Sequence, residues 1–165
     1  NKFTEIFKYF KINNKNMSLL EIGCGHGVYT VILYKLFKSI TAIDPEKKLI
    51  ELFNQKIKKE KLKIETMVSS CEDFEHKNKF DVILFSNSFM WVGDKQKCLL
   101  KTCNHLKKNG YLIILQPVKF TNLKFKNQRL KIIDSMNALI KSRKLKLIHF
   151  TLFNSKTFIY VLKLN

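Results

Sequence analysis

LLEIGCGHGVYT, residues 19–30, is a short apolar segment that runs into three closely spaced glycines and then into a helical pattern. The glycines stand at positions 23, 25 and 27, and the whole chain has only five. Glycine tolerates positive φ and lets a ligand come close to the backbone. A glycine-rich turn from a strand into a helix is where α/β sheets hold nucleotide-like ligands. This stretch therefore predicts a ligand-binding loop in an α/β domain.

Strand and helix patterns alternate along the chain on both sides of this loop. Alternating or continuous apolar runs predict strands over residues 17–22, 39–44, 62–68, 80–85 and 111–115. Apolar spacings of three and four predict helices over residues 2–13, 28–37, 46–60, 95–107 and 126–143. Strands over 146–153 and 156–164, with a turn at Asn154-Ser155, predict a hairpin. Asp44 is expected to cap the helix over 46–60, and Asn109-Gly110 to stop the helix over 95–107.

The alternation predicts one α/β domain over residues 1–165 with a Rossmann-like, seven-stranded sheet. The sheet is expected to be mostly parallel, with an antiparallel C-terminal hairpin and with helices on both faces. The run over 80–85 is the most apolar, which is typical of a central strand covered on both sides.

Charge and cysteine usage suggest a cellular setting. The formal net charge of +18 favours an anionic partner such as nucleic acid, but the Lys-, Asn- and Ile-rich composition is also what an AT-rich genome produces. Neither C-x-x-C spacing nor a histidine cluster accompanies the cysteines, which are Cys24, Cys71, Cys98 and Cys103. We therefore expect reduced thiols of a cytoplasmic protein, with no disulfide and no metal site. No membrane span is expected either, because no apolar run reaches about 18 residues, and no signal-peptide core is expected, because residues 1–14 mix charges with aromatics.

The spacing of the glycines distinguishes between ligands. A dinucleotide-binding loop has the pattern G-x-G-x-x-G, but Val28 stands three residues after Gly25. The Gly-Lys-Ser/Thr of a phosphate-binding P-loop is absent from this stretch. The pattern that is present, E-x-G-x-G-x-G from Glu21 to Gly27, resembles the first motif of the class I S-adenosylmethionine-dependent methyltransferases.

This resemblance implies S-adenosylmethionine as the cofactor and gives roles to residues around the loop. Glu21 would face the cationic amino group of the cofactor, and Asp44, followed by Pro45, would accept hydrogen bonds from the ribose hydroxyls. The backbone that would follow the methionine chain is that of Gly23, Cys24, Gly25 and Gly27. The structural alternatives are a strand-edge charge for Glu21 and a simple helix cap for Asp44.

Three further segments extend the resemblance over residues 17–116. SSCED, residues 69–73, stands where the family usually has G-D-A-E-D, so Ser70 replaces the aspartate that approaches adenine, beside Cys71 and Glu72. FDVILFSNSFMWVGD, residues 80–94, resembles a signature of the subgroup with trans-aconitate and malonyl-carrier-protein O-methyltransferases, and it adds Ser86 and Asn87 to the cofactor side. LKKNGYLII, residues 106–114, resembles the L-K-P-G-G-x-L of the family.

The resemblance also divides the chain into a cofactor side and a substrate side. Residues 17–116 would form the cofactor-binding core, with 1–14 as an N-terminal helix and candidate lid and 117–165 as a substrate-side loop, helix and hairpin. The candidate substrate residues are Tyr9, Phe89, Met90, Trp91 and Lys119. Trp91 either packs at the edge of the site or touches the substrate.

The substrate class follows from what the motifs lack. SNSF, residues 86–89, has none of the N-P-P-Y or D-P-P-Y character with which family members grip a planar amine, and Met90 stands where many relatives carry His or Gln. None of the four histidines has a partner acid at a suggestive spacing, and a carboxylate acceptor needs no base. The catalytic residue is therefore left open.

We expect a methyltransferase that acts on a small or peripheral acceptor, with an oxygen favoured as the atom that receives the methyl group. Two alternatives stay open. One is an RNA methyltransferase, favoured by the basic charge, and the other is a non-catalytic partner subunit that keeps the fold, favoured by Ser70 and Met90. The sequence leaves the acceptor and the oligomeric state undetermined.

Overall fold

The computed structural model of the chain describes residues 5, 7, 8, 12, 14–117, 134, 136–138, 140–142, 145–153 and 157–165. Several expectations lie outside these residues: the candidate substrate residues Tyr9 and Lys119, the turn at Asn154-Ser155, and most of the helices expected over 2–13 and 126–143.

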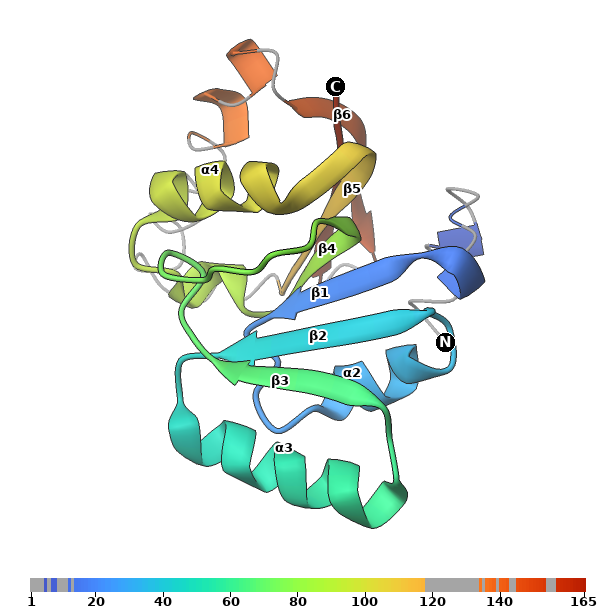
Figure 1. The fold of residues 1–165 in the computed structure, drawn as a ribbon. Coiled ribbons are helices and arrows are strands. Elements are labelled where there is room, and N and C mark those ends of the chain that lie inside the picture. The colour runs from blue at the N-terminus through green and yellow to red at the C-terminus, as the bar shows by residue number, and fades with distance from the viewer. Residues whose placement is uncertain are drawn as a thin grey trace.

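A seven-stranded sheet in the order β3-β2-β1-β4-β5-β7-β6 forms the centre of the molecule (Figure 1). Its strands are β1 (Ser18–Ile22), β2 (Ser39–Asp44), β3 (Ile64–Val68), β4 (Phe80–Ser86), β5 (Leu106–Pro117), β6 (Leu145–Phe153) and β7 (Thr157–Leu164). Strands β1 to β5 pair in parallel, whereas β7 is antiparallel to both β5 and β6. The predicted fold class, with its parallel sheet and C-terminal hairpin, is confirmed.

Helices cover both faces of this sheet. They are α2 (Val28–Tyr34), α3 (Lys47–Glu60) and α4 (Lys95–His105), with short 3₁₀ turns at η1 (Asn14–Asn16) and η2 (Phe89–Trp91). The two faces of β4 explain the arrangement, since Val82 and Leu84 pack with Leu33 of α2, whereas Ile83 and Phe85 pack with Leu99 of α4. Helices α2 and α3 accordingly lie on one side of the sheet and α4 on the other (Figure 1). β4 is the central strand, as its apolar run predicts.

The strand order reverses between β1 and β4, and a reversal of this kind marks the position of a ligand crevice. β1 pairs with β2 on one side and with β4 on the other, so the connections from β1 and from β4 leave in opposite directions. At such a switch point the loops that follow the two strands separate, and ligands of open α/β sheets bind outside the carboxyl ends of the strands there. The glycine loop after β1 lies at this point.

Three expected helix boundaries are wrong. Helix α2 ends at Tyr34, three residues before its expected end, with Lys35 as its C-cap. Helix α4 ends at His105, because Leu106 takes an extended conformation and pairs with Phe80 at the start of β4. Asn109, at φ 63°, and Gly110 therefore lie within β5, where the register against β4 shifts, instead of stopping the helix. The N-cap of α3 is Glu46, whose carboxylate accepts from the backbone N–H of Lys48, whereas Asp44 lies one step earlier, at the end of β2.

Membrane crossing was not expected from the sequence. None of the helices in the part of the chain that the structure describes combines the length and the apolar character that crossing a bilayer requires.

Candidate functional site

A cavity of about 470 Å³ lies at the carboxyl ends of β1, β2, β3 and β4. Four segments contribute to its wall: the glycine loop after β1, the end of β2, the β3–β4 connection, and the segment between β4 and α4. The predicted residues that line it are Gly23, Gly25, Asp44, Pro45, Ser70, Cys71, Glu72, Asn87 and Trp91. The lining residues that sequence reasoning missed are Ile22, Ser88, Val92 and Gly93. One cavity thus joins motifs that are up to about 70 positions apart in the chain.

The three glycines of the loop have different reasons to be glycine. All three have positive φ, with values of 74° at Gly23, 57° at Gly25 and 80° at Gly27. A Cβ at Gly23 would lie 2.3 Å from Cβ of Ser88, and one at Gly27 would lie 2.1 Å from the ring of Phe53. A Cβ at Gly25 would meet nothing within 4 Å. Packing within the protein therefore requires the first and the last glycine, whereas the middle one leaves open space beside the cavity.

Asp44 presents a fixed carboxylate to the cavity. Its Oδ2 accepts from the backbone N–H of Gly25 at 2.8 Å, and its Oδ1 accepts from that of Glu46 at 2.9 Å. The side chain is largely buried, so these two bonds hold it in one orientation. Each carboxylate oxygen still has a free acceptor position. Two neighbouring acceptors held rigidly at the end of a strand suit a ligand with a pair of hydroxyl groups.

Glu21 lies beneath the glycine loop and does not line the cavity. Its side chain is buried, and its Oε2 accepts from the hydroxyl of Thr30 in α2 at 2.6 Å. Burial raises the pKa of this carboxyl to about 7, against the opposing effect of the Thr30 hydrogen bond. Glu21 therefore ties the start of the loop to the first turn of α2.

Cys24 and Gly27 also lie outside the cavity wall. Burial, followed by the negative charges of Glu21 and Asp44, raises the pKa of the Cys24 thiol, so this sulfur stays protonated and unreactive. Gly27 is the N-cap of α2 and packs against Phe53. Both residues therefore support the conformation of the loop without lining the cavity.

Ser70, Cys71 and Glu72 form the wall between β3 and β4. The hydroxyl of Ser70 donates to Oδ2 of Asp73 at 2.7 Å and accepts from the backbone N–H of Asp73 at 3.1 Å. That hydroxyl retains one acceptor position toward a ligand. Oε1 of Glu72 accepts from the backbone N–H of Asp94 at 3.0 Å, which links this wall to the segment before α4.

Cys71 forms a disulfide with Cys98 of α4, and the expectation of four reduced thiols is wrong for this pair. The Cα atoms lie 5.3 Å apart, although the residues are separated by 27 positions in the sequence. The contact arises because the β3–β4 connection packs on α4, and no spacing rule for cysteines encodes such a tertiary contact. Cys24 and Cys103 are free and buried, as expected of reduced thiols.

The segment after β4 supplies the remaining wall. Asn87, at φ 61°, donates from its side-chain amide to the hydroxyl of Tyr29 at 3.2 Å, and Ser88 donates from its hydroxyl to the carbonyl of Ile22. Ser88 is thereby held against Gly23, so the need for a small residue opposite a glycine was the signal that could have identified it. Trp91 lies at the rim with 71% of its surface exposed.

Three other predicted residues lie outside the cavity wall. Phe89 is fully buried against Phe85, with ring centroids 4.9 Å apart, so it is a core residue. Met90 donates its backbone N–H to Oε1 of Gln116 at 3.1 Å. Ser86 is buried at the end of β4, and its hydroxyl has no hydrogen-bond partner among the described residues. Of the candidate substrate residues, Trp91 alone lines the cavity within the described part of the chain.

Among the described residues, the cavity contains neither a histidine that could act as a base nor a cluster that could hold a metal ion. None of the residues that line the cavity is a histidine. His76 stacks on Phe74 and lies 3.5 Å from a carboxylate oxygen of Glu65, while His105 is bonded to the carbonyl of Lys101. Over the described ranges, no group of three or more His, Cys, Asp and Glu side chains is placed to hold a metal ion. The cavity offers fixed acceptors and open backbone, which are the means of binding and orienting a ligand.

A family model and the curated relatives that match this chain agree on one class of protein. A family model described as a methyltransferase domain matches residues 13–154. The ubiquinone biosynthesis O-methyltransferase of Pelagibacter ubique is 40% identical over 114 residues, which are 66% of this chain and 48% of that protein. The malonyl-[acyl-carrier protein] O-methyltransferase of Priestia megaterium is 29% identical over 102 residues, which are 61% of this chain and 36% of that protein.

The structural comparison agrees on the fold. A SAM-dependent methyltransferase from Aquifex aeolicus superposes with a TM-score of 0.83 at 17% identity, covering 98% of this chain and 89% of that one. The match to the curated relatives spans about half of their length or less.

Proposed function

Because this chain belongs to the methyltransferase-domain family, whose model matches residues 13–154, we propose that it transfers a methyl group from S-adenosylmethionine to an oxygen of a small molecule. The observation that carries this proposal is the open space at Gly25 beside the fixed carboxylate of Asp44, in a cavity of about 470 Å³.

The residues of the cavity fit the cofactor by their chemistry. Asp44 has two free acceptor positions for the two ribose hydroxyls, and the open space at Gly25 leaves room for the methionine chain. On the adenine side of the cofactor, the lining residues would be Ser70, Cys71 and Glu72, with Asn87 on the segment after β4. Glu21 acts from beneath, through its bond to Thr30, by fixing where the loop begins.

When it is bound, the cofactor supplies an electrophilic methyl group on a sulfonium. The part of the protein is then to place that methyl group in line with the acceptor atom and to keep water away, which can account for much of the rate enhancement. Trp91, at the rim of the cavity, is the described residue best placed to border the acceptor. Tyr9 and Lys119 stay proposals for the same role.

Three observations support an oxygen acceptor. The two curated relatives described above are both named O-methyltransferases. The segment 86–89 has no proline-rigidified clamp for a planar amine. Among the described residues that line the cavity there is no histidine to remove a proton, and a carboxylate acceptor would not require one. A carboxylate is therefore the acceptor group that the described site suits best.

RNA is the second candidate acceptor, and the observation in its favour is a basic groove that could bind a polyanion. A cavity of about 550 Å³ at the amino ends of the same strands is lined by lysines at positions 38, 63, 79 and 107. Its two acids are engaged within the protein, since Asp81 pairs with Lys107 at 2.7 Å and Glu65 accepts from Thr41 at 2.9 Å. With a net charge of +18, this groove suits a polyanion. It lies at the opposite edge of the sheet from the cofactor cavity, which disfavours RNA as the methyl acceptor.

We also propose a cytoplasmic location. Cys24 and Cys103, which are buried and form no disulfide, support it, whereas the Cys71–Cys98 disulfide is a bond that cytoplasmic proteins rarely keep.

The test is transfer of an isotopically labelled methyl group from S-adenosylmethionine to three acceptor classes: small carboxylic acids, small hydroxyl compounds and RNA. We expect label on an oxygen of a small molecule, and on a carboxylate before a hydroxyl. Label in RNA alone would support the second candidate. Binding of the cofactor without transfer to any class would support the non-catalytic alternative.

A further inference from the structure

We propose that Cys71 and Cys98 form a redox-active pair on the cofactor cavity: the disulfide holds the adenine-side wall in place, and reduction to two thiols weakens cofactor binding. The inference rests on the proposed function, because its readout is binding of the cofactor product. It goes beyond that function in making the site responsive to the thiol state of its surroundings.

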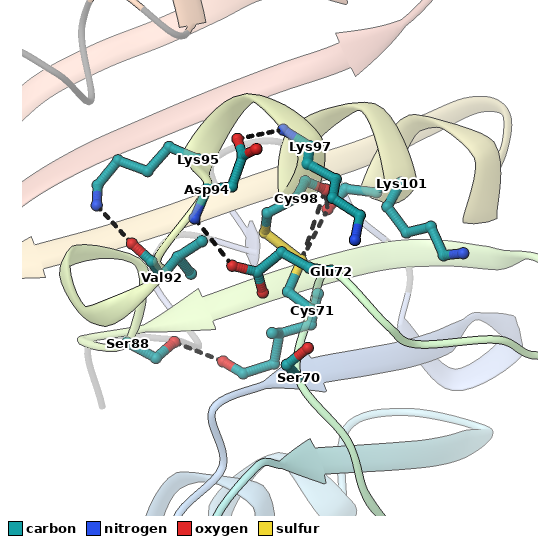
Figure 2. The surroundings of a disulfide bond; sticks show 12 residues. Ser70, Cys71, Glu72, Ser88, Val92, Asp94, Lys95, Lys97, Cys98 and Lys101 are labelled. Carbon is teal, nitrogen blue, oxygen red and sulfur yellow. Dashed lines mark hydrogen bonds between the residues drawn. A yellow bond between two sulfur atoms is a disulfide. The ribbon is translucent and has the colours of Figure 1, made fainter.

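The position of the pair couples the cavity to a helix on the far side of the wall. Cys71 lines the cavity, between Ser70 and Glu72, whereas Cys98 is fully buried in the first turn of α4. Figure 2 shows the disulfide crossing from the β3–β4 connection to α4, with Glu72 directed at the backbone of Asp94. The bond is therefore the one covalent link between this wall and the helix layer in the described part of the chain.

The other ties between this connection and α4 are the hydrogen bond from the N–H of Asp94 to Glu72, the packing of Phe74 on His105, and ion pairs at the surface. Asp73 lies 3.6 Å from Lys97, and Glu75 pairs with Lys101. The carboxylate side chains of these pairs are 75% and 77% exposed, and exposed ion pairs contribute little to holding a loop. Phe74, by contrast, is buried in the core. Reduction should therefore loosen Ser70, Cys71 and Glu72 while Phe74 keeps the rest of the connection in place.

The surroundings of the sulfur atoms accommodate the reduced state as well. Sγ of Cys71 lies 3.5 Å from the carbonyl oxygen of Cys98, which is an acceptor for the Cys71 thiol once the disulfide is open. The hydroxyl of Thr102 already donates to the same carbonyl at 2.8 Å. The Cys71 thiol thus has a hydrogen-bond acceptor in the reduced state.

Reduction by a dithiol gives a balanced reaction. A thiolate of the dithiol attacks Sγ of Cys71, the residue of the pair that lines the cavity, and Cys98 leaves as a thiolate that takes up a proton. The second thiol of the reductant then displaces Cys71, so the reductant becomes a disulfide and both cysteines end as thiols. Two electrons and two protons pass from the dithiol to the pair. Cys71 lines the cavity but is only 5% exposed, so a bound cofactor would further hinder the approach of a dithiol from that side.

Binding and redox state must then influence each other by the same factor. If the oxidised protein binds the cofactor product more tightly, the bound product makes the disulfide harder to reduce to the same extent. This reciprocity separates a functional coupling from a disulfide that merely stabilises the fold.

The experiment measures the affinity for S-adenosylhomocysteine by calorimetry on the oxidised protein, on the protein reduced with dithiothreitol, and on Cys98→Ser. We expect reduction and Cys98→Ser to weaken binding by a similar factor, at least about fivefold. The control is Cys103→Ser, which removes a free cysteine from the same helix and should retain both the wild-type affinity and its response to reductant.

The outcomes separate the two proposals. Equal affinity of the oxidised and reduced proteins, or two free thiols at positions 71 and 98 in protein exposed to air, would overturn the redox pair and leave the methyltransferase proposal intact. No binding in either state would overturn both. If Cys98→Ser does not fold, hydrogen exchange of residues 69–73 in the wild type, with and without reductant, decides: no difference in exchange contradicts the inference.

Discussion

At the scale of single residues, the glycine loop separates what the protein needs for folding from what it needs for its ligand. Gly23 and Gly27 have neighbours that a methyl group would strike, whereas Gly25 has open space beside the cavity. All three lie at positive φ, so an alanine at any of them carries a backbone cost of about 1–2 kcal/mol. Only steric contact distinguishes the three positions within the folded protein.

Gly27→Ala and Gly25→Ala should therefore fail in different ways. Gly27→Ala places a methyl group on the ring of Phe53 and should lower the free energy of unfolding by about 3 kcal/mol or more. Gly25→Ala should cost only about 1–2 kcal/mol but weaken binding of S-adenosylhomocysteine by tenfold or more, on the order of a lost ligand contact. Urea unfolding and calorimetry measure the two effects. Equal losses of stability in both variants would contradict the assignment of Gly25 to the ligand.

Glu21 makes stability depend on pH. Its pKa is raised to about 7 in the folded protein, so the folded state holds a proton that the unfolded state has released between about pH 4.5 and 7. The stabilising contribution of the protonated carboxyl is complete below the unfolded pKa and is lost as the pH rises through about 7. The shift from 4.5 to about 7 corresponds to about 3 kcal/mol.

Glu21→Gln should remove this dependence. A glutamine carbonyl can still accept from the Thr30 hydroxyl, and it carries no charge to desolvate. We expect the variant to be more stable than the wild type at pH 8 and to lose less stability between pH 5 and pH 8. Urea titrations at the two pH values measure the difference. An identical pH dependence in both proteins would show that Glu21 titrates normally.

At the scale of elements, the sequence predicts the strands and helices that depend on a local pattern of apolar residues. The apolar run at 80–85 predicted the central strand, and the segments 146–153 and 156–164 predicted the antiparallel pair that closes the sheet. Residues of the glycine loop and of the end of β2 line one cavity.

The errors come from contacts between elements. Asn109-Gly110 is a helix-stop signal by composition, but burial of Leu106 against β4 begins the strand before it. Glu21 has the position of a ligand-facing acid in its motif, yet its side chain turns to Thr30. The disulfide and the role of Ser88 both depend on chain segments that meet only after folding.

The disulfide should also contribute to global stability. Closing a loop of 27 residues restricts the unfolded chain by about 3–4 kcal/mol in the chain-entropy account. Reduction should therefore lower the Tm by about 10 °C for a domain of this size. Thermal unfolding followed by circular dichroism, with and without dithiothreitol, measures this shift, and Cys98→Ser should show the lower Tm without reductant. A Tm that does not respond to reductant would indicate that the disulfide is absent, or that the reduced unfolded chain is as restricted as the oxidised one.

At the scale of the whole molecule, the sheet separates two chemistries onto opposite edges. The carboxyl ends of the strands hold the cavity with Asp44 and the glycine loop, and the amino ends hold the lysine-lined groove. The net charge of +18 is therefore not concentrated where a cofactor would bind. An anionic substrate or a polyanion could be attracted by the molecule as a whole, at a rate that falls with salt, without entering the cofactor cavity.

The central claim is that the cavity at the carboxyl ends of β1 to β4 binds S-adenosylmethionine through Asp44. Calorimetry with S-adenosylhomocysteine on the wild type, on Asp44→Asn and on Glu51→Gln tests it most directly. Glu51 is an exposed acid on α3 and serves as the control for loss of one negative charge. We expect saturable one-to-one binding by the wild type and by Glu51→Gln, and binding at least tenfold weaker in Asp44→Asn, which is about 1.4 kcal/mol or more. Unchanged affinity in Asp44→Asn, or no binding by the wild type at millimolar ligand, would contradict the account.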